Sequence, residues 1–157
     1  MNPFEQSDSG AWRYASRSPQ DTERLGRAIG NALQGGEILA LYGELGTGKT
    51  TLVRGIAAGA GAPPQRVTSP TFVLIHEYHG RLRLAHADLY RIMSADELPH
   101  TGLSDYLDDH TVVAIEWAER QPWIDRFNVF YHLGLDGISF WFVLLTAFGG
   151  LGALLYV

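Results

Sequence analysis

The residues with the clearest chemical potential form one segment, Gly43-Glu44-Leu45-Gly46-Thr47-Gly48-Lys49-Thr50, which contains the only lysine of the 157-residue chain. This segment matches the phosphate-binding pattern G-x-x-x-x-G-K-[ST] at every position. A flexible side chain with a compact ammonium group can reach the β- and γ-phosphates of a nucleotide, whereas a planar guanidinium would need a different geometry. We therefore predict that Lys49 contacts these phosphates and that Thr50 offers its hydroxyl to Mg²⁺.

The flanking sequence predicts the elements that would hold this segment in place. Residues 37–42 form an apolar run of strand length, and residues 49–58 are typical of a helix. A strand, a glycine loop and a helix are needed together, because loop N–H groups and the helix N-terminus hold the phosphates. Gly46 and Gly48 are expected to permit a positive φ and a close approach to phosphate. Thr51 is a further candidate, for the α-phosphate, and the alternative is a glycine-rich turn without a ligand.

Two carboxylates are candidates for the magnesium site that a phosphate-binding loop requires. Asp88 and Glu116 each follow an apolar stretch, and P-loop enzymes hold Mg²⁺ with an acid at a strand end, directly or through water. Asp88 could instead cap a helix that begins at Leu89. Glu116 could also have an incidental place on the surface.

Other polar residues permit a functional and a structural interpretation. Ser69-Pro70-Thr71 carries two hydroxyls on a turn fixed by proline, which could sense the γ-phosphate or simply lead into a strand. Arg91 could stabilise transferred phosphoryl charge or pair with a carboxylate. Trp117 is more typical of core or interface packing than of base stacking. His76, His79 and His86 could suggest zinc, but without a matching carboxylate cluster they are better explained as satisfied or solvent-facing side chains.

Composition limits the possible partners and surroundings of the chain. A formal net charge of −5 argues against binding nucleic acid through a basic surface of its own. The absence of cysteine excludes a disulfide framework and thiolate metal sites, and it is compatible with a reducing cytoplasm. Residues 1–10 are polar and lack the basic start and apolar stretch of a secretory signal, so we expect a disordered lead-in.

The remaining sequence predicts an alternation of strands and helices. Ser18-Pro19 is typical of an N-cap followed by a first helical proline, and the helix it begins should stop at Gly35-Gly36. The other expected elements are a strand at 11–16, a hairpin of 72–78 and 81–87, a short helix from Ser94, and a buried strand at 111–115.

The C-terminal segment differs in character from the rest of the chain. Residues 137–157 contain no charged residue in 21 positions, and 15 of these positions are apolar. About 20 such residues can span a bilayer as a helix. Residues 126–157 are therefore expected to be an atypical apolar tail with a possible membrane-spanning helix.

Several segments together resemble the TsaE family. They are residues 43–51 with Arg54-Gly55, Ser69-Pro70-Thr71-Phe72, Glu77-Tyr78, His86-Ala87-Asp88-Leu89-Tyr90-Arg91, and Ile115-Glu116-Trp117-Ala118-Glu119-Arg120, in the order and spacing of the family. The resemblance covers residues 11–123. It implies a small bacterial ATPase of the pathway that places threonylcarbamoyl on adenosine 37 of tRNA. It also implies that Glu116 belongs to the magnesium site, that Asp88 lies in the catalytic centre, and that the stretch around Ser69 and Thr71 behaves as a switch.

The tail departs from that family, which continues after the Glu-Trp motif with strands that complete the sheet. Residues 131–139 resemble instead part of a membrane-embedded chain of the proton-pumping NADH:quinone oxidoreductases. No function is assigned to this fragment, since it could not pump protons alone.

The sequence thus predicts an α/β P-loop fold over residues 11–125, with a mainly parallel sheet and an antiparallel hairpin. The expected function is Mg²⁺-dependent binding and slow hydrolysis of ATP in the cytoplasm, with tRNA met only indirectly through the partner proteins TsaD and TsaB. A nonenzymatic nucleotide switch and a small-molecule kinase of the P-loop type remain alternatives, as does a version tethered to the membrane by residues 138–157.

Overall fold

The computed structural model describes residues 4–6, 12–70, 73–92, 95–117, 139–140 and 142–146. Its main sheet has five strands in the order β4-β5-β6-β3-β8. The central strands β5 (Arg83–Asp88), β6 (Thr111–Trp117) and β3 (Glu37–Tyr42) run parallel, and β4 (Ile75–His79) and β8 (Phe142–Thr146) flank them antiparallel. The expected α/β fold with a parallel centre and an antiparallel hairpin is confirmed.

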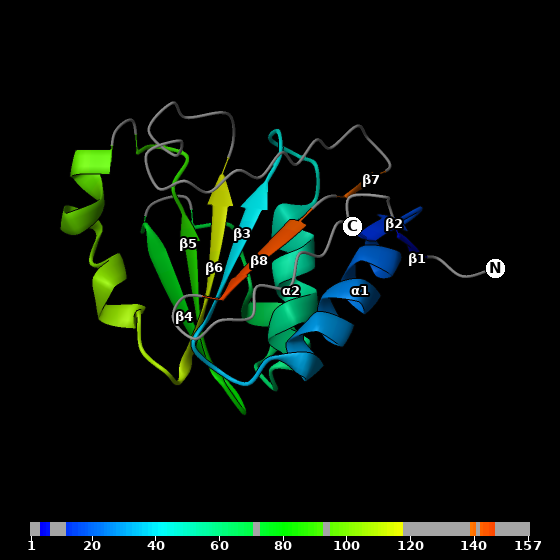
Figure 1. Cartoon of the computed structure of the whole chain (residues 1–157), viewed down its shortest axis with the longest axis horizontal. Helices are drawn as coiled ribbons and strands as arrows, with labels where there is room; N and C mark the ends of the chain where they lie inside the picture. Colours follow the sequence, from blue (N-terminus) through cyan, green and yellow to red (C-terminus); the bar gives the residue numbers. More distant parts are fainter. Residues whose placement is uncertain are drawn as a thin grey trace.

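Two helices pack beside this sheet, as Figure 1 shows: α1 (Pro19–Ala32) and α2 (Lys49–Gly59). The N-cap of α1 is Ser18, whose side chain accepts a hydrogen bond from the N–H of Asp21 at 3.1 Å. Pro19 occupies the first helical position, where its missing N–H costs nothing. Helix α1 ends before Gly35 and Gly36, which both adopt positive φ, as the sequence predicts.

Contact between α1 and α2 is unusually close because glycines face each other. A Cβ added to Gly26 would lie 2.4 Å from the carbonyl oxygen of Leu52, and one added to Gly55 would lie 2.4 Å from that of Glu23. Gly30 and Gly59 repeat this arrangement one turn further along each helix. The two backbones therefore approach to a distance that no residue with a side chain would permit.

The alternation of side chains along the strands creates two apolar layers. Leu84, Val112 and Ala114 face the layer that includes α1 and α2, whereas Ala85 and Val113 face the other layer. Short 3-10 helices, η2 (Ala95–Thr101) and η3 (Leu103–Tyr106), supply Leu98, Leu103 and Tyr106 to that second layer. A third 3-10 helix, η1 (Pro64–Arg66), follows α2.

Both ends of the chain differ from what the sequence predicts. Residues 4–6, expected to be disordered, form strand β1 (Phe4–Gln6), which pairs antiparallel with β2 (Trp12–Ala15). In the expected apolar tail, β7 (Ser139–Phe140) pairs with β2, and β8 pairs with the free edge of β3. The physical reason is the same in each case: the backbone groups of an edge strand are satisfied by another strand.

These strands correct the interpretation of the tail as a membrane-spanning helix, for the residues that can be described. Among them, no helix combines the length and the apolar character that crossing a bilayer would require. The sheet of this chain is therefore extended by a C-terminal strand, and residues 142–146 do not belong to an apolar helix that replaces it.

Candidate functional site

The phosphate-loop segment lies between the end of β3 and the start of α2, as its sequence predicts. Gly46 has φ of 84° and Gly48, the N-cap residue of α2, has φ of 98°. Both values lie in the left-handed region, where glycine avoids the steric penalty of a Cβ. The loop therefore curls back over the N-terminus of α2, where backbone N–H groups have no partner within the helix.

A cavity of about 370 Å³ opens at this end of the sheet. Its volume falls in the range of roughly 300–1,000 Å³ that is usual for ligand pockets. Nine predicted site residues line it, together with Tyr90. Among the described residues, the lining is Leu45, Gly46, Gly48, Lys49, Thr50, Thr51, Ser69, Asp88, Tyr90 and Glu116.

The other predicted site residues have different places. Gly43 and Glu44 form the start of the loop and accept hydrogen bonds from Lys49 through their carbonyl oxygens. Thr47 closes a turn by donating from its hydroxyl to the carbonyl oxygen of Glu44 at 2.8 Å. Thr71 lies outside the described residues.

Lys49 is folded back onto its own loop. Its Nζ donates to the carbonyl oxygens of Gly43 at 2.7 Å and Glu44 at 2.8 Å. Burial lowers the pKa of Lys49, and the nearby charges of Glu116 and Asp88 act in the opposite direction. The ammonium group of Lys49 is therefore partly desolvated and is held by two neutral carbonyl groups. It is well placed to exchange these carbonyl groups for an anionic ligand.

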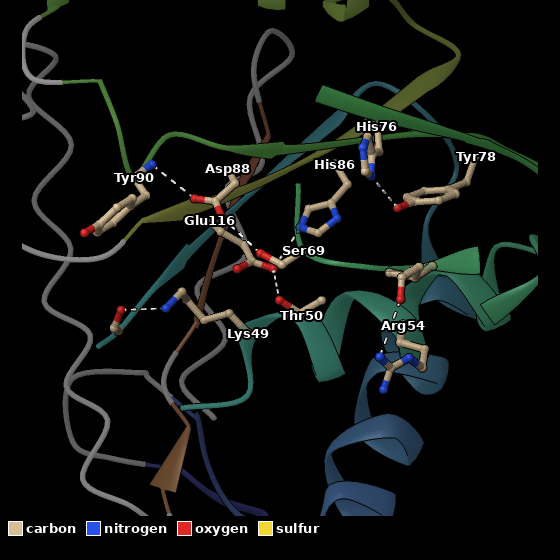
Figure 2. Close-up of polar contacts among 12 residues, drawn as sticks. Lys49, Thr50, Arg54, Ser69, His76, Tyr78, His86, Asp88, Tyr90 and Glu116 are labelled. Carbon is tan, nitrogen blue, oxygen red and sulfur yellow. Dashed lines mark hydrogen bonds and ion pairs between the residues drawn. The ribbon is translucent and has the colours of Figure 1, made fainter. Parts of the chain in front are cut away.

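Glu116 is the meeting point of three elements. It stands near the carboxyl end of β6, only 4% exposed, and its Oε1 accepts a hydrogen bond of 2.9 Å from the hydroxyl of Thr50 on α2. Nε2 of His86, on β5, lies 2.8 Å from the same oxygen. Figure 2 shows Thr50 and His86 approaching Glu116 from different sides, with Lys49 nearby.

Asp88 ends the neighbouring strand and lies in register with Glu116. Its Oδ2 accepts from the hydroxyl of Ser69 at 3.2 Å, and its Oδ1 accepts from the N–H of Tyr90 at 3.1 Å. The bond from the N–H of Tyr90 resembles the helix cap that the sequence analysis offered as an alternative role for Asp88. However, residues 89–92 form a turn and not a helix, so Asp88 caps a turn. One carboxylate oxygen thus fixes the chain, and the other engages Ser69 from the predicted switch segment.

The remaining candidates of the sequence lie away from this cluster. Arg91 is exposed and does not line the cavity. His76 is half-buried with its Nδ1 3.4 Å from the hydroxyl of Tyr78, and His79 is exposed beside Glu77. The polar contacts of the three histidines therefore go to three different partners, Tyr78, Glu77 and Glu116, and not to a common point.

The sequence predicts a satisfied or solvent-facing His86, and its Nε2 does have a partner; the sequence analysis missed that this partner is the site residue Glu116. The available clue was the position of His86 two residues before Asp88 on a predicted strand, because side chains at i and i+2 face the same side of a sheet. Tyr90 was also missed as a cavity residue; its side chain is largely exposed and lines the cavity mouth.

The arrangement of these residues fits a nucleoside triphosphate bound together with a divalent cation such as Mg²⁺. The loop, the N-terminus of α2 and Lys49 supply N–H groups and positive charge for phosphate. The oxygens of Thr50 and Glu116 meet at one point, and oxygen is the ligand that Mg²⁺ prefers.

Comparisons with known proteins indicate the family of the chain. The model of the family described as "Threonylcarbamoyl adenosine biosynthesis protein TsaE" matches residues 16–134. The chain is 44% identical to the tRNA threonylcarbamoyladenosine biosynthesis protein TsaE of Treponema pallidum over 108 residues, which are 69% of this chain and 79% of the relative. It is 39% identical to the TsaE protein of Bacillus subtilis over 108 residues, which are 68% of this chain and 65% of the relative.

A solved structure supports the same fold. The crystal structure of Bacillus subtilis YdiB superposes with a TM-score of 0.55 at 25% identity, covering 94% of this chain and 90% of that one. The family match extends to residue 134 and so includes residues that the sequence analysis assigned to the departing tail. The suggested resemblance of that tail to a membrane-embedded subunit is not supported. The chain belongs to the TsaE family of threonylcarbamoyl adenosine biosynthesis proteins.

Proposed function

We propose that the chain binds ATP with Mg²⁺ and hydrolyses it slowly, in support of threonylcarbamoyl transfer to adenosine 37 of tRNA. The observation that carries this proposal is the convergence of Lys49, Thr50, Asp88 and Glu116 on one cavity beside a phosphate loop. Membership of the TsaE family supplies the pathway, and the site supplies the chemistry.

Each group has a distinct part in this proposal. Residues 43–51 hold the polyphosphate through backbone N–H groups, with Lys49 at the β- and γ-phosphates and Thr51 at the α-phosphate. Thr50 and Glu116 would hold Mg²⁺, which would supply positive charge to neutralise the charge that develops on the phosphates. Lys49 releases the carbonyl groups of Gly43 and Glu44 when it turns to the nucleotide.

Asp88 is proposed to orient the attacking water. Its Oδ1 is anchored by the N–H of Tyr90, so the carboxylate is held at the cavity wall. Its Oδ2 carries the hydroxyl of Ser69, which lies on the segment that would respond to the γ-phosphate together with Thr71. Loss of the γ-phosphate would change this contact, and the segment could then report the state of the nucleotide.

TsaD and TsaB are the proposed partners, and tRNA would be met only through their complex, in the cytoplasm. The formal net charge of −5 supports action through proteins, because the chain has little means of neutralising an RNA backbone.

The test is Mg²⁺-dependent ATP hydrolysis by this chain and by Lys49→Ala, each with and without the TsaD–TsaB pair. We expect turnover that requires Lys49 and rises when the partners are added. Soluble protein that binds ATP and both partners without any turnover would replace the ATPase with a nucleotide switch. Protein that binds no nucleotide would overturn the proposal.

A further inference from the structure

His86 is the most deeply buried polar side chain near the site, and the functional roles proposed above do not use it. It is 0% exposed, in the middle of β5, on the face of the sheet that meets α2. Its Nε2 lies 2.8 Å from Oε1 of Glu116. The centroid of its ring lies 6.4 Å from the centroid of the Tyr78 ring. A polar ring fully enclosed in an apolar layer is costly unless its hydrogen bonds are made.

The contact with Glu116 decides which nitrogen of the ring carries a proton. A carboxylate oxygen only accepts, so the proton must lie on Nε2. Nδ1, which is buried, has no hydrogen-bond partner among the described residues. All of the polar interaction of His86 within the described structure is therefore directed at Glu116.

Oε1 of Glu116 consequently accepts two hydrogen bonds, one from His86 and one from Thr50. These two donors differ in what they can do next. Thr50 lines the cavity, so its hydroxyl can turn its lone pairs toward a cation there. His86 is held within the sheet and is absent from the cavity wall, so it stays on the carboxylate.

We infer that His86 is a positioning residue, which holds the carboxylate of Glu116 in the orientation that lets it act with Thr50 on Mg²⁺. This inference rests on the proposed function, in which the two oxygens form the magnesium site. With His86 in place, Glu116 keeps one fixed partner while Thr50 changes from donor to ligand. Without it, the carboxylate can rotate when Thr50 leaves, and the cation must reorder it.

Three substitutions separate this role from simple packing. The amide nitrogen of glutamine can reach about as far as Nε2, so His86→Gln should preserve the contact with Glu116. Asparagine is equally polar but too short, so His86→Asn should lose it. His86→Leu removes the polar group altogether. The matched control is His76→Leu, on the adjacent strand directly opposite His86, since His76 contacts Tyr78 and not Glu116.

The readout is binding of Mn²⁺, as a paramagnetic substitute for Mg²⁺, to protein saturated with a nonhydrolysable ATP analogue. We expect His86→Asn and His86→Leu to weaken Mn²⁺ binding about 10- to 100-fold, as is usual for partners that orient metal ligands. His86→Gln and His76→Leu should remain close to the unmodified chain. Affinity for the analogue in EDTA should be the same in all of them, because a positioning role acts only through the cation.

Three results would count against the inference. If His86→Asn binds Mn²⁺ as tightly as His86→Gln, the hydrogen bond to Glu116 has no positioning role; this comparison decides even if His86→Leu fails to fold. If all three His86 variants lose affinity for the analogue in EDTA while His76→Leu keeps it, His86 is a packing residue. If the unmodified chain binds the analogue without any strengthening by Mn²⁺, the proposed magnesium site itself is wrong, and the inference fails with it.

Discussion

The hydroxyl of Thr50 donates to Oε1 of Glu116 across 2.9 Å, although 66 residues separate the two in the chain. This bond joins the first turn of α2 to the carboxyl end of β6, and it places at one point the two oxygens that we assign to Mg²⁺. The separation in sequence means that the contact depends on the parallel pairing of β3 with β6.

Replacing Thr50 with valine should affect both the metal chemistry and the stability of the fold, and the two effects can be measured separately. Valine keeps the shape but removes the hydroxyl, so we expect Mg²⁺-dependent hydrolysis to fall on the order of 100-fold. Buried Glu116 also loses one of its two hydrogen-bond partners, which should cost about 1–2 kcal/mol of unfolding free energy. Steady-state hydrolysis over a Mg²⁺ titration and urea denaturation measure the two effects. Thr50→Ser is the control, and equal loss in both variants would contradict a role for the hydroxyl.

Asp88→Asn should reduce turnover while leaving nucleotide binding intact. The amide oxygen can still accept from the N–H of Tyr90, so the turn should persist. The lost carboxylate would no longer orient water, and we expect hydrolysis to fall by about 10²–10⁴. ATP affinity should be unchanged or tighter, because a negative charge near the phosphates is removed. Ser69→Ala should give a smaller loss; an Asp88→Asn protein with full turnover would exclude Asp88 from the chemistry.

The close contact of α1 with α2 predicts the cost of one added methyl group. In Gly26→Ala the new Cβ would meet the carbonyl oxygen of Leu52 at 2.4 Å, so the helices must separate. We expect a loss of about 1–3 kcal/mol in unfolding free energy, as for other overpacked cores. Asn31→Ala, at an exposed position of the same helix, should stay within about 0.5 kcal/mol. Urea denaturation that shows equal stability for both variants would contradict the packing described above.

Asp108 should give a stabilisation that depends on pH. Its Oδ1 accepts from the N–H groups of His110 at 2.8 Å and Thr111 at 2.7 Å, just where β6 begins. These bonds, that of His110 foremost, hold the pKa of Asp108 below its usual value of 3.8. The pKa of Asp108 is lower in the folded protein than in the unfolded chain, so the stabilisation is complete above about pH 3.8. It is lost as the pH falls through the pKa of Asp108 in the folded protein.

The measurement is the urea midpoint of the unmodified chain and of Asp108→Ala between pH 7 and pH 3. We expect Asp108→Ala to be less stable at pH 7 and the difference to narrow toward pH 3. Asp109→Ala is the control, because the neighbouring side chain takes no part in this cap. A difference for Asp108→Ala that stays constant over the whole range would show that its charge is irrelevant.

Much of the geometry of the candidate site could be predicted because its pattern is local. The loop and the start of α2 lie within a dozen residues, and β3 has the bounds that its apolar run indicates. Asp88 and Glu116 were identifiable as acids at strand ends. Their mutual placement was not, since it depends on the register that sets Asp88 opposite Glu116, and the same register brings His86 to that carboxylate.

The C-terminal strand β8 shows that composition alone is insufficient to predict whether an apolar segment forms a helix or a strand. An apolar run without charge suits a membrane helix and a sheet strand equally, and periodicity alone does not separate them. The strand is favoured here because β8 pairs with an edge of β3 that would otherwise be unpaired. In this pairing, residues Glu37–Leu41 of β3 lie opposite residues 142–146. That partner lies about a hundred residues earlier in the chain, and its free edge is visible only once the sheet is assembled.

The glycine contacts between α1 and α2 have a mechanical consequence. With Gly26 and Gly55 in backbone contact, neither helix can slide or tilt without driving its main chain into the other. We therefore expect the two helices to move together. A displacement of the N-terminus of α2, under the phosphate loop, would then also displace α1, and a second protein bound to α1 would respond to the nucleotide without contacting it.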